Sequence, residues 1–251
     1  MRNKIIVYMF ITISSTAFAY GQNVKSTEHL QQLWFGYFNQ ARFSNRWGSW
    51  IDLQLRTKEN FTNELSQSIL RFGLIYYVTD ATKLTVGYAY VNNFPGDNHK
   101  YISQTEHRPW QQIQWYTKYG KQRMMQSIRL EEKFKRKILN DSTLADGYSF
   151  NYKIRCNLWY EIPLSKKGVV PNTLSFIVND EFHINFGRQI VNNYFDQNRF
   201  FIGLKYQTNI HDNLQVGYMN LFQQLAGGNK YKNINAVRIF YYQNIDLRKN
   251  K

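Results

Sequence analysis

Hydrophobic and polar residues alternate along most of this chain with a period of two residues. In a β-strand successive side chains point to opposite faces, so this alternation predicts strands with one apolar and one polar face. Stripes with the helical period of 3.6 residues are scarce, and the sequence therefore predicts an all-β fold. The clearest runs are residues 51–55, 70–78, 84–90, 152–162, 200–206 and 237–247.

The length of these runs and of their connections indicates an antiparallel up-and-down barrel that crosses a membrane. Eleven runs are visible, and each has about ten residues, the length that a tilted strand needs to cross a bilayer. Short periplasmic turns and longer external loops are typical of outer-membrane barrels. The short connections are residues 44–48, 80–83, 120–123 and 209–213, and the long ones are residues 58–66, 94–107, 138–147 and 187–196.

The number of strands is constrained by the class of protein. Bacterial single-chain barrels have an even number of strands, so eleven runs do not fit directly. We expect about 12 strands, with residues 22–31 supplying a short polar first strand, or 10 strands as the alternative.

The first 21 residues predict a signal peptide. Arg2 and Lys4 form a basic start, residues 5–13 an apolar core, and Ala17 and Ala19 a small-x-small cleavage site. The core of about nine residues is shorter than the roughly 20 that a membrane helix needs. No later segment has 18 uncharged apolar residues in a row, so we expect residues 22–251 to form one barrel domain that enters the membrane with strands.

Composition favours a membrane barrel over a soluble β-sandwich. The chain contains 19 Tyr, 18 Phe and 6 Trp, yet its mean hydropathy is −0.55. A soluble core would depend on Ile, Leu and Val, whereas a barrel between lipid and a wet interior needs both aromatic and polar residues. We expect aromatic girdles at the two membrane interfaces, formed by Trp34, Tyr37, Trp50, Tyr90, Trp110, Tyr119, Tyr160, Tyr206 and Tyr241.

Charge is concentrated on the face that the alternation turns inward. Without Arg2 and Lys4, 30 basic residues stand against 17 acidic ones, a net charge of +13. Paired charges would fill a narrow lumen, whereas an open positive lining would select anionic solutes. The expected lumen charge network consists of Arg56, Arg71, Arg129, Glu131, Lys133, Arg155, Glu161, Glu181, Arg199 and Arg238.

Arg129, Glu131 and Lys133 stand two residues apart on one strand face and form a ladder of alternating sign. Such a ladder is able to pair with Glu161, Arg155 or Arg71 on other strands.

Candidates for catalysis and for metal binding are few. His183 lies two residues from Glu181 and from Asn185, and this makes a lipid-modifying hydrolase with a lumen histidine the alternative function. No Gly-x-Ser-x-Gly elbow is present. The five histidines have no metal-ligand spacing, and the single cysteine, Cys156, excludes an intramolecular disulfide. We expect no cofactor and no metal.

A set of segments along the chain occurs in a characteristic order. The segments are residues 34 and 50–56, 87–90, 106–112, 129–134, 179–187, 196–200 and 214–218. Together they resemble an uncharacterised family of predicted outer-membrane β-barrels of Gram-negative bacteria, a domain of unknown function. The resemblance covers nearly the whole mature chain, implies the barrel fold and the outer membrane, and brings no established activity. The family's Arg-x-Glu-x-Arg pattern ends here in Lys133, which lacks the planar bidentate donor of arginine.

The expected function is therefore that of a non-enzymatic outer-membrane barrel, either structural or a narrow passive pore with a positive lumen. The expected partners are outer-membrane lipid, lipopolysaccharide, the barrel assembly machinery and small anionic solutes. An exported chain meets little nucleic acid, so its positive charge does not predict nucleic-acid binding.

Overall fold

The computed structural model describes residues 24–96 and 99–248, and over these residues the chain forms eleven β-strands. None of the described residues belongs to a helix that is long and apolar enough to cross a membrane. The expected signal peptide, residues 1–21, lies outside the described residues. The strands are β1 Ser26–Arg42, β2 Trp47–Glu59, β3 Asn63–Tyr77, β4 Thr82–Asn93, β5 Gln104–Tyr119, β6 Gln122–Asn140, β7 Thr143–Pro163, β8 Thr173–Phe186, β9 Phe195–Gln207, β10 Asp212–Gln224 and β11 Lys230–Asp246.

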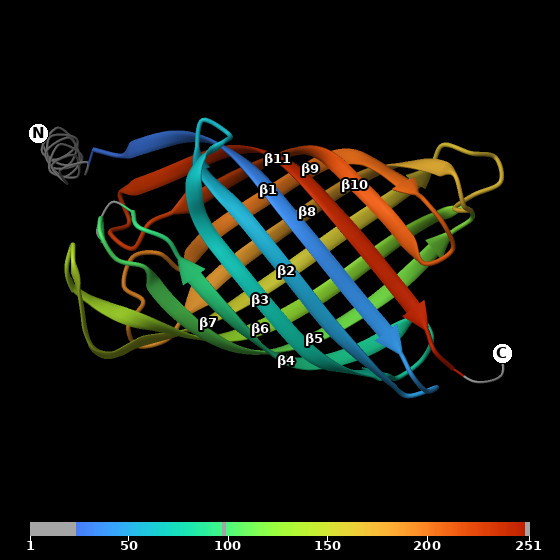
Figure 1. Ribbon diagram of the computed structural model, residues 1–251, viewed down its shortest axis with the longest axis horizontal. Coiled ribbons are helices and arrows are strands. Elements are labelled where there is room, and N and C mark those ends of the chain that lie inside the picture. Colours follow the sequence, from blue (N-terminus) through green and yellow to red (C-terminus); the bar gives the residue numbers. More distant parts are fainter. Residues whose placement is uncertain (1–23, 97–98, 249–251) are drawn as a thin grey trace, which may run out of the picture.

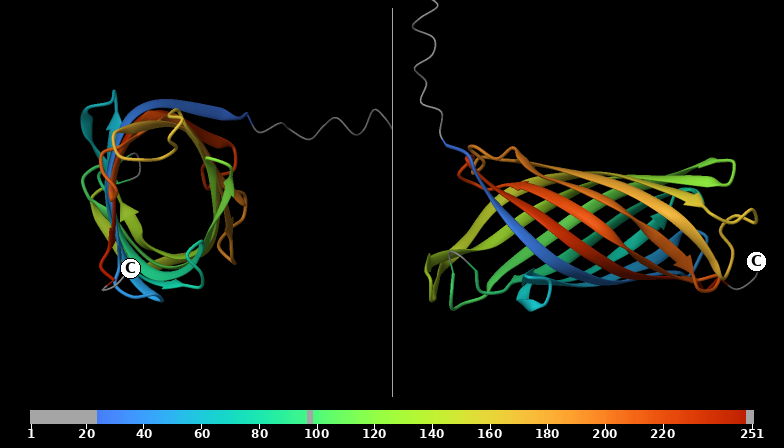
Figure 2. Two further views of the ribbon diagram at one scale, coloured as in Figure 1. Left: turned by 90° about the vertical axis from the view of Figure 1, so that its right-hand side faces the viewer. Right: turned by 90° about the horizontal axis from the view of Figure 1, so that it is seen from above.

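The sheet closes into a barrel through a parallel pair of strands (Figures 1 and 2). Consecutive strands are antiparallel, but β1 pairs in parallel with β11 from Ser26↔Lys230 to Arg42↔Asp246. The prediction of 12 or 10 strands is therefore wrong, as is that of a purely antiparallel barrel. Residues 26–31 do not form a separate strand, because they are the first residues of β1. The first and last strands then run in the same direction, and an odd number closes the ring.

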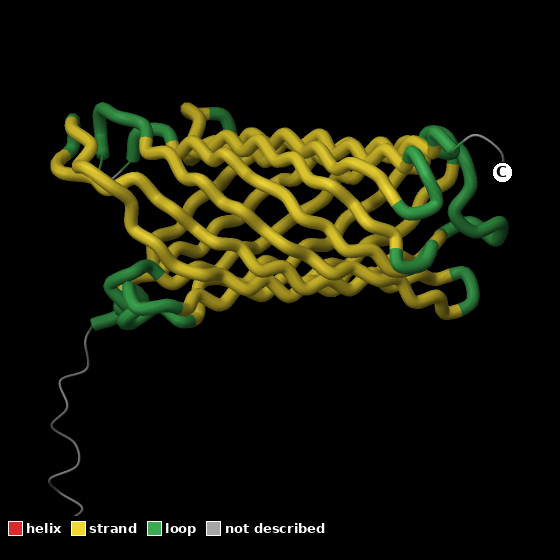
Figure 3. The backbone as a smooth tube through the Cα atoms, turned by 90° about the horizontal axis from the view of Figure 1, so that it is seen from below, coloured by secondary structure: helices red, strands yellow, loops and turns green. Residues whose placement is uncertain are grey.

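Connections differ between the two ends of the barrel (Figure 3). The four predicted short turns all lie at the end that carries the C-terminus, but residues 164–172 form a longer connection at the same end. At the N-terminal end, two predicted long loops, residues 58–66 and 138–147, are instead tight hairpins. Pairing in β6 and β7 continues to Asn140↔Thr143, so these strands project beyond the barrel wall. The expected alternation of loop lengths is thus only partly correct.

The outer surface of the barrel carries the apolar face of each strand. Leu53 and Leu74 keep 47% of their surface exposed and Val86 keeps 56%, values that a soluble protein reserves for isolated residues. Because side chains alternate along a strand, the neighbours of these residues point into the lumen. Other exposed members of this outer apolar band are Ile51, Leu55, Leu70, Phe72, Leu84, Ile113, Ile128, Leu158, Leu174, Phe200, Ile202, Leu204 and Val216.

Aromatic rings border the outer apolar band toward both ends. At the C-terminal end, Tyr37 stacks on Tyr241 with ring centroids 6.2 Å apart, and Trp47 contacts Tyr76 at 5.1 Å. Toward the N-terminal end, contacting rings form three groups along β4 to β11, with centroids 4.7–6.3 Å apart within each group. The members of this second row are Tyr88, Tyr90, His107, Phe134, Tyr148, Phe150, Tyr152, Phe182, Phe186, Phe195, Phe222 and Tyr231.

Among the residues of the band and of this second row, polar side chains on β8 to β11 form hydrogen bonds with one another. Asn198 donates to Asp180 at 2.6 Å, and Asn220 donates to Asn233 and Asn235 at 2.7 and 3.1 Å. Mutual hydrogen bonding lowers the cost of holding such groups against an apolar medium.

Glycines in the wall make room for large rings inside the barrel. Gly217 of β10 pairs with Gly203 of β9, and a Cβ on Gly217 would meet Ile202 O at 2.2 Å and the Phe201 ring at 2.8 Å. Phe201 is fully buried beside this pair. A side chain at either glycine would therefore collide with backbone as well as with a ring.

Gly217→Ala is accordingly expected to lower the free energy of unfolding by about 1–3 kcal/mol, the usual cost of overpacking. Urea titration of the refolded barrel measures this change. Gly227→Ala is the control, because the nearest atom to its added Cβ is Asn229 Oδ1 at 3.4 Å. Equal losses for the two variants would contradict this account of the Gly203 and Gly217 pair.

Candidate functional site

The lumen brings most of the predicted charged residues together. Asp52, Arg71, Glu131 and Glu161 are almost completely enclosed by the barrel wall and its inner side chains. Lys133, Arg155 and Arg199 keep less than a fifth of their side chains exposed. All ten predicted network residues therefore face the interior, on β2, β3, β6, β7, β8, β9 and β11.

Glu131 is the centre of the largest ion cluster. Arg155 Nη1 from β7 lies 2.8 Å from Glu131 Oε1, Arg129 Nη1 lies 3.7 Å from the same oxygen, and Arg108 Nη1 from β5 lies 3.5 Å from Oε2. Three guanidinium groups thus share one carboxylate that is 1% exposed. Of the partners predicted for the ladder, Arg155 contacts Glu131, whereas Arg71 pairs with Asp52, and Glu161 pairs with Arg123 and Lys205.

Glu181 joins this cluster to the next strands. Arg155 donates to Glu181 Oε1 from Nε at 3.0 Å and from Nη2 at 2.5 Å, so the same guanidinium bridges two carboxylates. Arg199 Nη1 lies 3.2 Å from Glu181 Oε2, and His183 Nε2 lies 3.0 Å from it. This arrangement cross-links β6, β7, β8 and β9 from the inside.

Separate pairs occupy both sides of the central cluster. Arg71 donates to Asp52 at 2.9 Å, and the Trp50 indole donates to the other Asp52 oxygen at 2.7 Å. Nearer the C-terminal end, Glu161 accepts from Arg123 at 2.8 Å and from Lys205 at 2.7 Å. The predicted network is therefore divided into several clusters.

Several charged lumen residues were missing from the sequence prediction, among them Glu106, Arg108 and Asp196. Glu106 accepts from Arg108 Nη2 at 2.5 Å and lies 3.7 Å from Lys133, which is therefore not paired with Glu131. Asp196 accepts from Lys153 at 2.6 Å. Glu106 and Arg108 share the phase of the inward Gln112, so the alternation contained this signal. Asp196 had been assigned to a loop, but β9 begins at Phe195.

Three tryptophans predicted for the membrane girdles lie inside the lumen instead. Trp34, Trp50 and Trp110 are 3%, 9% and 1% exposed. Each has the same phase as the inward polar residues of its strand, and each offers its ring to an arginine. Arg56 Cζ lies 3.6 Å from the Trp34 ring centroid, and Arg129 Cζ lies 4.3 Å from that of Trp110. The strand phase turns these rings inward, and cation–π contact with the arginines is favourable in a confined interior.

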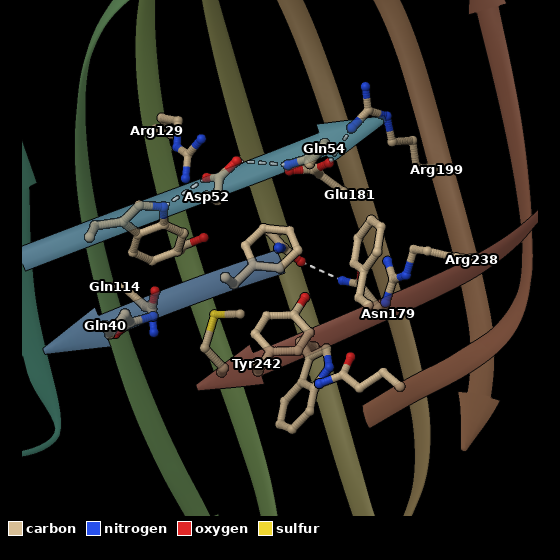
Figure 4. A pocket seen from close by; sticks show the side chains of 18 of the residues that line it. Gln40, Asp52, Gln54, Gln114, Arg129, Asn179, Glu181, Arg199, Arg238 and Tyr242 are labelled. Atoms are coloured by element: carbon tan, nitrogen blue, oxygen red, sulfur yellow. Dashed lines mark hydrogen bonds and ion pairs between the residues drawn. The ribbon is translucent and has the colours of Figure 1, made fainter. Parts of the chain in front are cut away.

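Two cavities occupy the lumen, with volumes of about 210 and 290 Å³. The first lies toward the C-terminal end, and the second toward the N-terminal end. Figure 4 shows Arg129, Arg199 and Arg238 entering the first cavity from different strands. Both cavities are lined by five residues that form the waist of the lumen, Trp34, Arg56, Arg71, Arg155 and Arg199.

Two guanidinium groups of the lumen lie outside the ion pairs of the described residues. Arg56 donates to Gln67 at 2.7 Å and to Gln54 at 3.1 Å but has no carboxylate within 4 Å. Arg238 lies over two aromatic rings, with Cζ 3.5 Å from the Phe201 centroid and 4.7 Å from that of Phe240. The Nε atoms of Arg56 and Arg238 are buried without a hydrogen-bond partner. The lumen therefore holds positive charge that the described carboxylates do not neutralise.

His183, the candidate for hydrolysis, is buried among groups that are not nucleophiles. Its Nε2 contacts Glu181, and its Nδ1 lies 3.0 Å from the Gln197 carboxamide. No serine, threonine or cysteine is among its hydrogen-bond partners in the described part of the chain. The same part of the chain contains no group of three or more His, Cys, Asp or Glu side chains that could hold a metal ion.

Comparison with known proteins identifies one family, and its match covers most of the barrel. Residues 31–232 match the family described as protein of unknown function, DUF2490. The chain belongs to this family. The match covers β2 to β10, most of β1 and only the first residues of β11, and it includes most of the lumen residues. No curated protein and no solved structure matches the chain.

Proposed function

We propose that this protein is an outer-membrane β-barrel of a Gram-negative bacterium and acts as a narrow, anion-selective pore. In this proposal outer-membrane lipid and lipopolysaccharide surround the barrel, and the barrel assembly machinery inserts it. The single observation that carries the proposal is the inverted polarity of the barrel, apolar outside and cationic inside.

The outer surface supports a lipid environment. A continuous apolar band between two aromatic borders matches the surface of outer-membrane barrels, whose apolar band is about 25 Å tall between aromatic girdles. The closed sheet pairs the backbone around the whole ring, which hydrocarbon requires because it provides no hydrogen-bonding partner.

The interior supports anions as the transported solutes. The 210 Å³ cavity is lined by eight basic side chains but by only two acidic ones, Asp52 and Glu181. Rings of positive side chains favour anions and repel cations electrostatically. The basic residues are Arg56, Arg71, Arg123, Arg129, Arg155, Arg199, Lys205 and Arg238.

The waist limits the size of the solute. Arg155 bridges Glu131 and Glu181, and Arg199 lies 5.2 Å from the Trp34 ring of β1. Side chains from β9 and β1 thus meet across the lumen, and we expect only small ions and solutes to pass.

Planar-bilayer recording of the refolded protein tests this function. Under a potassium chloride gradient we expect small, discrete conductance steps with a reversal potential displaced toward the chloride equilibrium potential. Cation selectivity would overturn the anion proposal. A protein that inserts without any conductance would be a closed structural barrel.

Leu74→Arg tests the membrane assignment. Leu74 is exposed in the outer apolar band, and we place it near the bilayer midplane, where an arginine is expected to cost about 2–4 kcal/mol of folding free energy in lipid vesicles. Leu139→Arg is the matched control, because Leu139 is 68% exposed near the tip of the projecting β6–β7 hairpin. Equal, small effects of both changes, or recovery of the native protein in a detergent-free periplasmic extract, would contradict a membrane location.

A further inference from the structure

Arg56 and Arg238, whose guanidinium groups lie outside the ion pairs of the described residues, occupy neighbouring positions in the barrel wall on either side of β1. Arg56 is the register partner of Trp34, and Trp34 is the register partner of Arg238. Adjacent strands are about 4.8 Å apart, so the two arginine backbones are separated by about 10 Å across β1. Both residues are more than nine-tenths buried, and both line the 210 Å³ cavity.

Burying a charge without a counter-charge is unfavourable unless a ligand supplies one. The other arginines at the waist, Arg71, Arg155 and Arg199, each have a carboxylate within 3.2 Å. Among the described residues, the hydrogen-bond and ring contacts of Arg56 and Arg238 are with carboxamides and aromatic rings. A carboxylate or phosphate group of a solute would complete these two positions and leave the existing ion pairs intact.

The other residues that line the 210 Å³ cavity indicate the chemistry of the part of the solute that carries no acid group. Carboxamides both donate and accept hydrogen bonds, as hydroxyl groups require, and flat aromatic faces pack against the apolar faces of a ring. Figure 4 shows Gln40, Gln54, Gln114 and Asn179 around the open space, with Tyr242 beside them. The full set of carboxamides is Gln40, Gln54, Gln112, Gln114, Asn157, Asn179, Asn213, Gln215 and Asn244, and the aromatic residues are Trp34, Phe38, Trp50, Tyr116, Trp159, Phe240 and Tyr242.

We propose that this cavity binds an acidic sugar of about monosaccharide size, with its carboxylate or phosphate between Arg56 and Arg238. The inference rests on the proposed function in one respect, since such a solute would reach the cavity through the lumen. Carboxamides and rings bind the hydroxylated body, and the two free guanidinium groups bind the acid. The volume of about 210 Å³ leaves room for one such ring.

Tryptophan fluorescence of the refolded protein in detergent micelles tests the site without requiring conduction. Trp34, Trp50 and Trp159 line the cavity, so a bound solute changes their emission. We expect saturable changes with glucuronate or with glucose 6-phosphate, and at least tenfold weaker binding of glucose and of acetate. Preference for one acidic sugar over the other identifies the carboxylate or the phosphate as the recognised group. No saturable response to either, or equal binding of glucose or acetate, would overturn the proposal.

Substitution of the two arginines locates the site. Arg56→Gln and Arg238→Gln are each expected to weaken binding of the acidic sugar by at least tenfold and to leave the melting temperature unchanged or raised, because neither change leaves a carboxylate unpaired. Lys118→Gln is the control, since Lys118 is an exposed basic residue at the end of β5. Binding that is unaffected in folded Arg56→Gln and Arg238→Gln proteins would overturn the assignment.

The two proposals fail separately. Saturable binding in micelles by a protein that gives no conductance would remove the pore and keep the site. Anion conductance without saturable binding of either acidic sugar would remove the site and keep the pore.

Discussion

Glu131→Gln is expected to lower the free energy of unfolding by about 3–5 kcal/mol, the usual cost of removing one partner from a buried ion cluster. Arg155, Arg108 and Arg129 all lie within 3.7 Å of the Glu131 carboxylate. A carboxamide has no charge and accepts through only one oxygen. The substitution therefore leaves Arg129 without a carboxylate among the described residues, and it removes the charge that Arg155 and Arg108 share in addition to Glu181 and Glu106. Urea unfolding in lipid vesicles, followed by far-UV circular dichroism, measures the change.

The matched control is Glu28→Gln, the same chemical change at the mouth of the barrel. Glu28 contacts Lys232 at 3.1 Å, but its side chain is 47% exposed, and an exposed pair contributes about 0–1 kcal/mol. A wide, wet lumen would screen the Glu131 cluster to the same small value. Equal effects of the two substitutions would therefore show that the waist is open.

Local alternation was sufficient to predict which residues face each side of the wall. Leu53 and Leu74 lie outside and Arg71 and Glu131 lie inside, as the period of two residues requires, because side-chain direction in a strand depends on local backbone geometry alone. The all-β barrel follows from the same signal, summed over eleven runs.

The number of strands and the closure of the sheet depend on non-local pairing, which no local pattern contains. The eleven alternating runs in the sequence correspond to the eleven strands. The expectation of 12 or 10 strands came instead from the even number of strands in other bacterial barrels. The parallel pairing of β1 with β11 removes the need for an even number.

Two errors about the lumen have different physical causes. The residue type of Trp34, Trp50 and Trp110 predicts membrane girdles, but their phase along each strand places them inward. The sequence predicts Arg155 as a partner of the Glu131 ladder but does not predict Arg108, because contacts between strands depend on the register of β5 and β7 against β6. A shift of one residue in either register would present different side chains to Glu131.

Trp110→Ala is expected to lower the free energy of unfolding by as much as Glu131→Gln and, in addition, to increase the conductance. Trp110 is 1% exposed, and its ring lies over two glycines, Gly73 and Gly87. Those positions have no side chains that could move into the space, and cavity formation at a buried tryptophan costs about 3–5 kcal/mol when the surroundings do not collapse.

The substitution also removes a support of the arginine layer. Arg129 lies 4.3 Å from the Trp110 ring centroid, and Trp50 contacts the same ring edge-to-face at 6.1 Å. Without the indole, the Arg129 guanidinium gains freedom and the lumen beside it widens, so we expect several-fold larger conductance steps with anion selectivity retained. Trp115→Ala on the outer face of the same strand is the control, with unchanged conductance expected. Unchanged steps in folded Trp110→Ala protein would show that ions do not pass beside Trp110, and the expected widening of the lumen next to Arg129 would then be wrong.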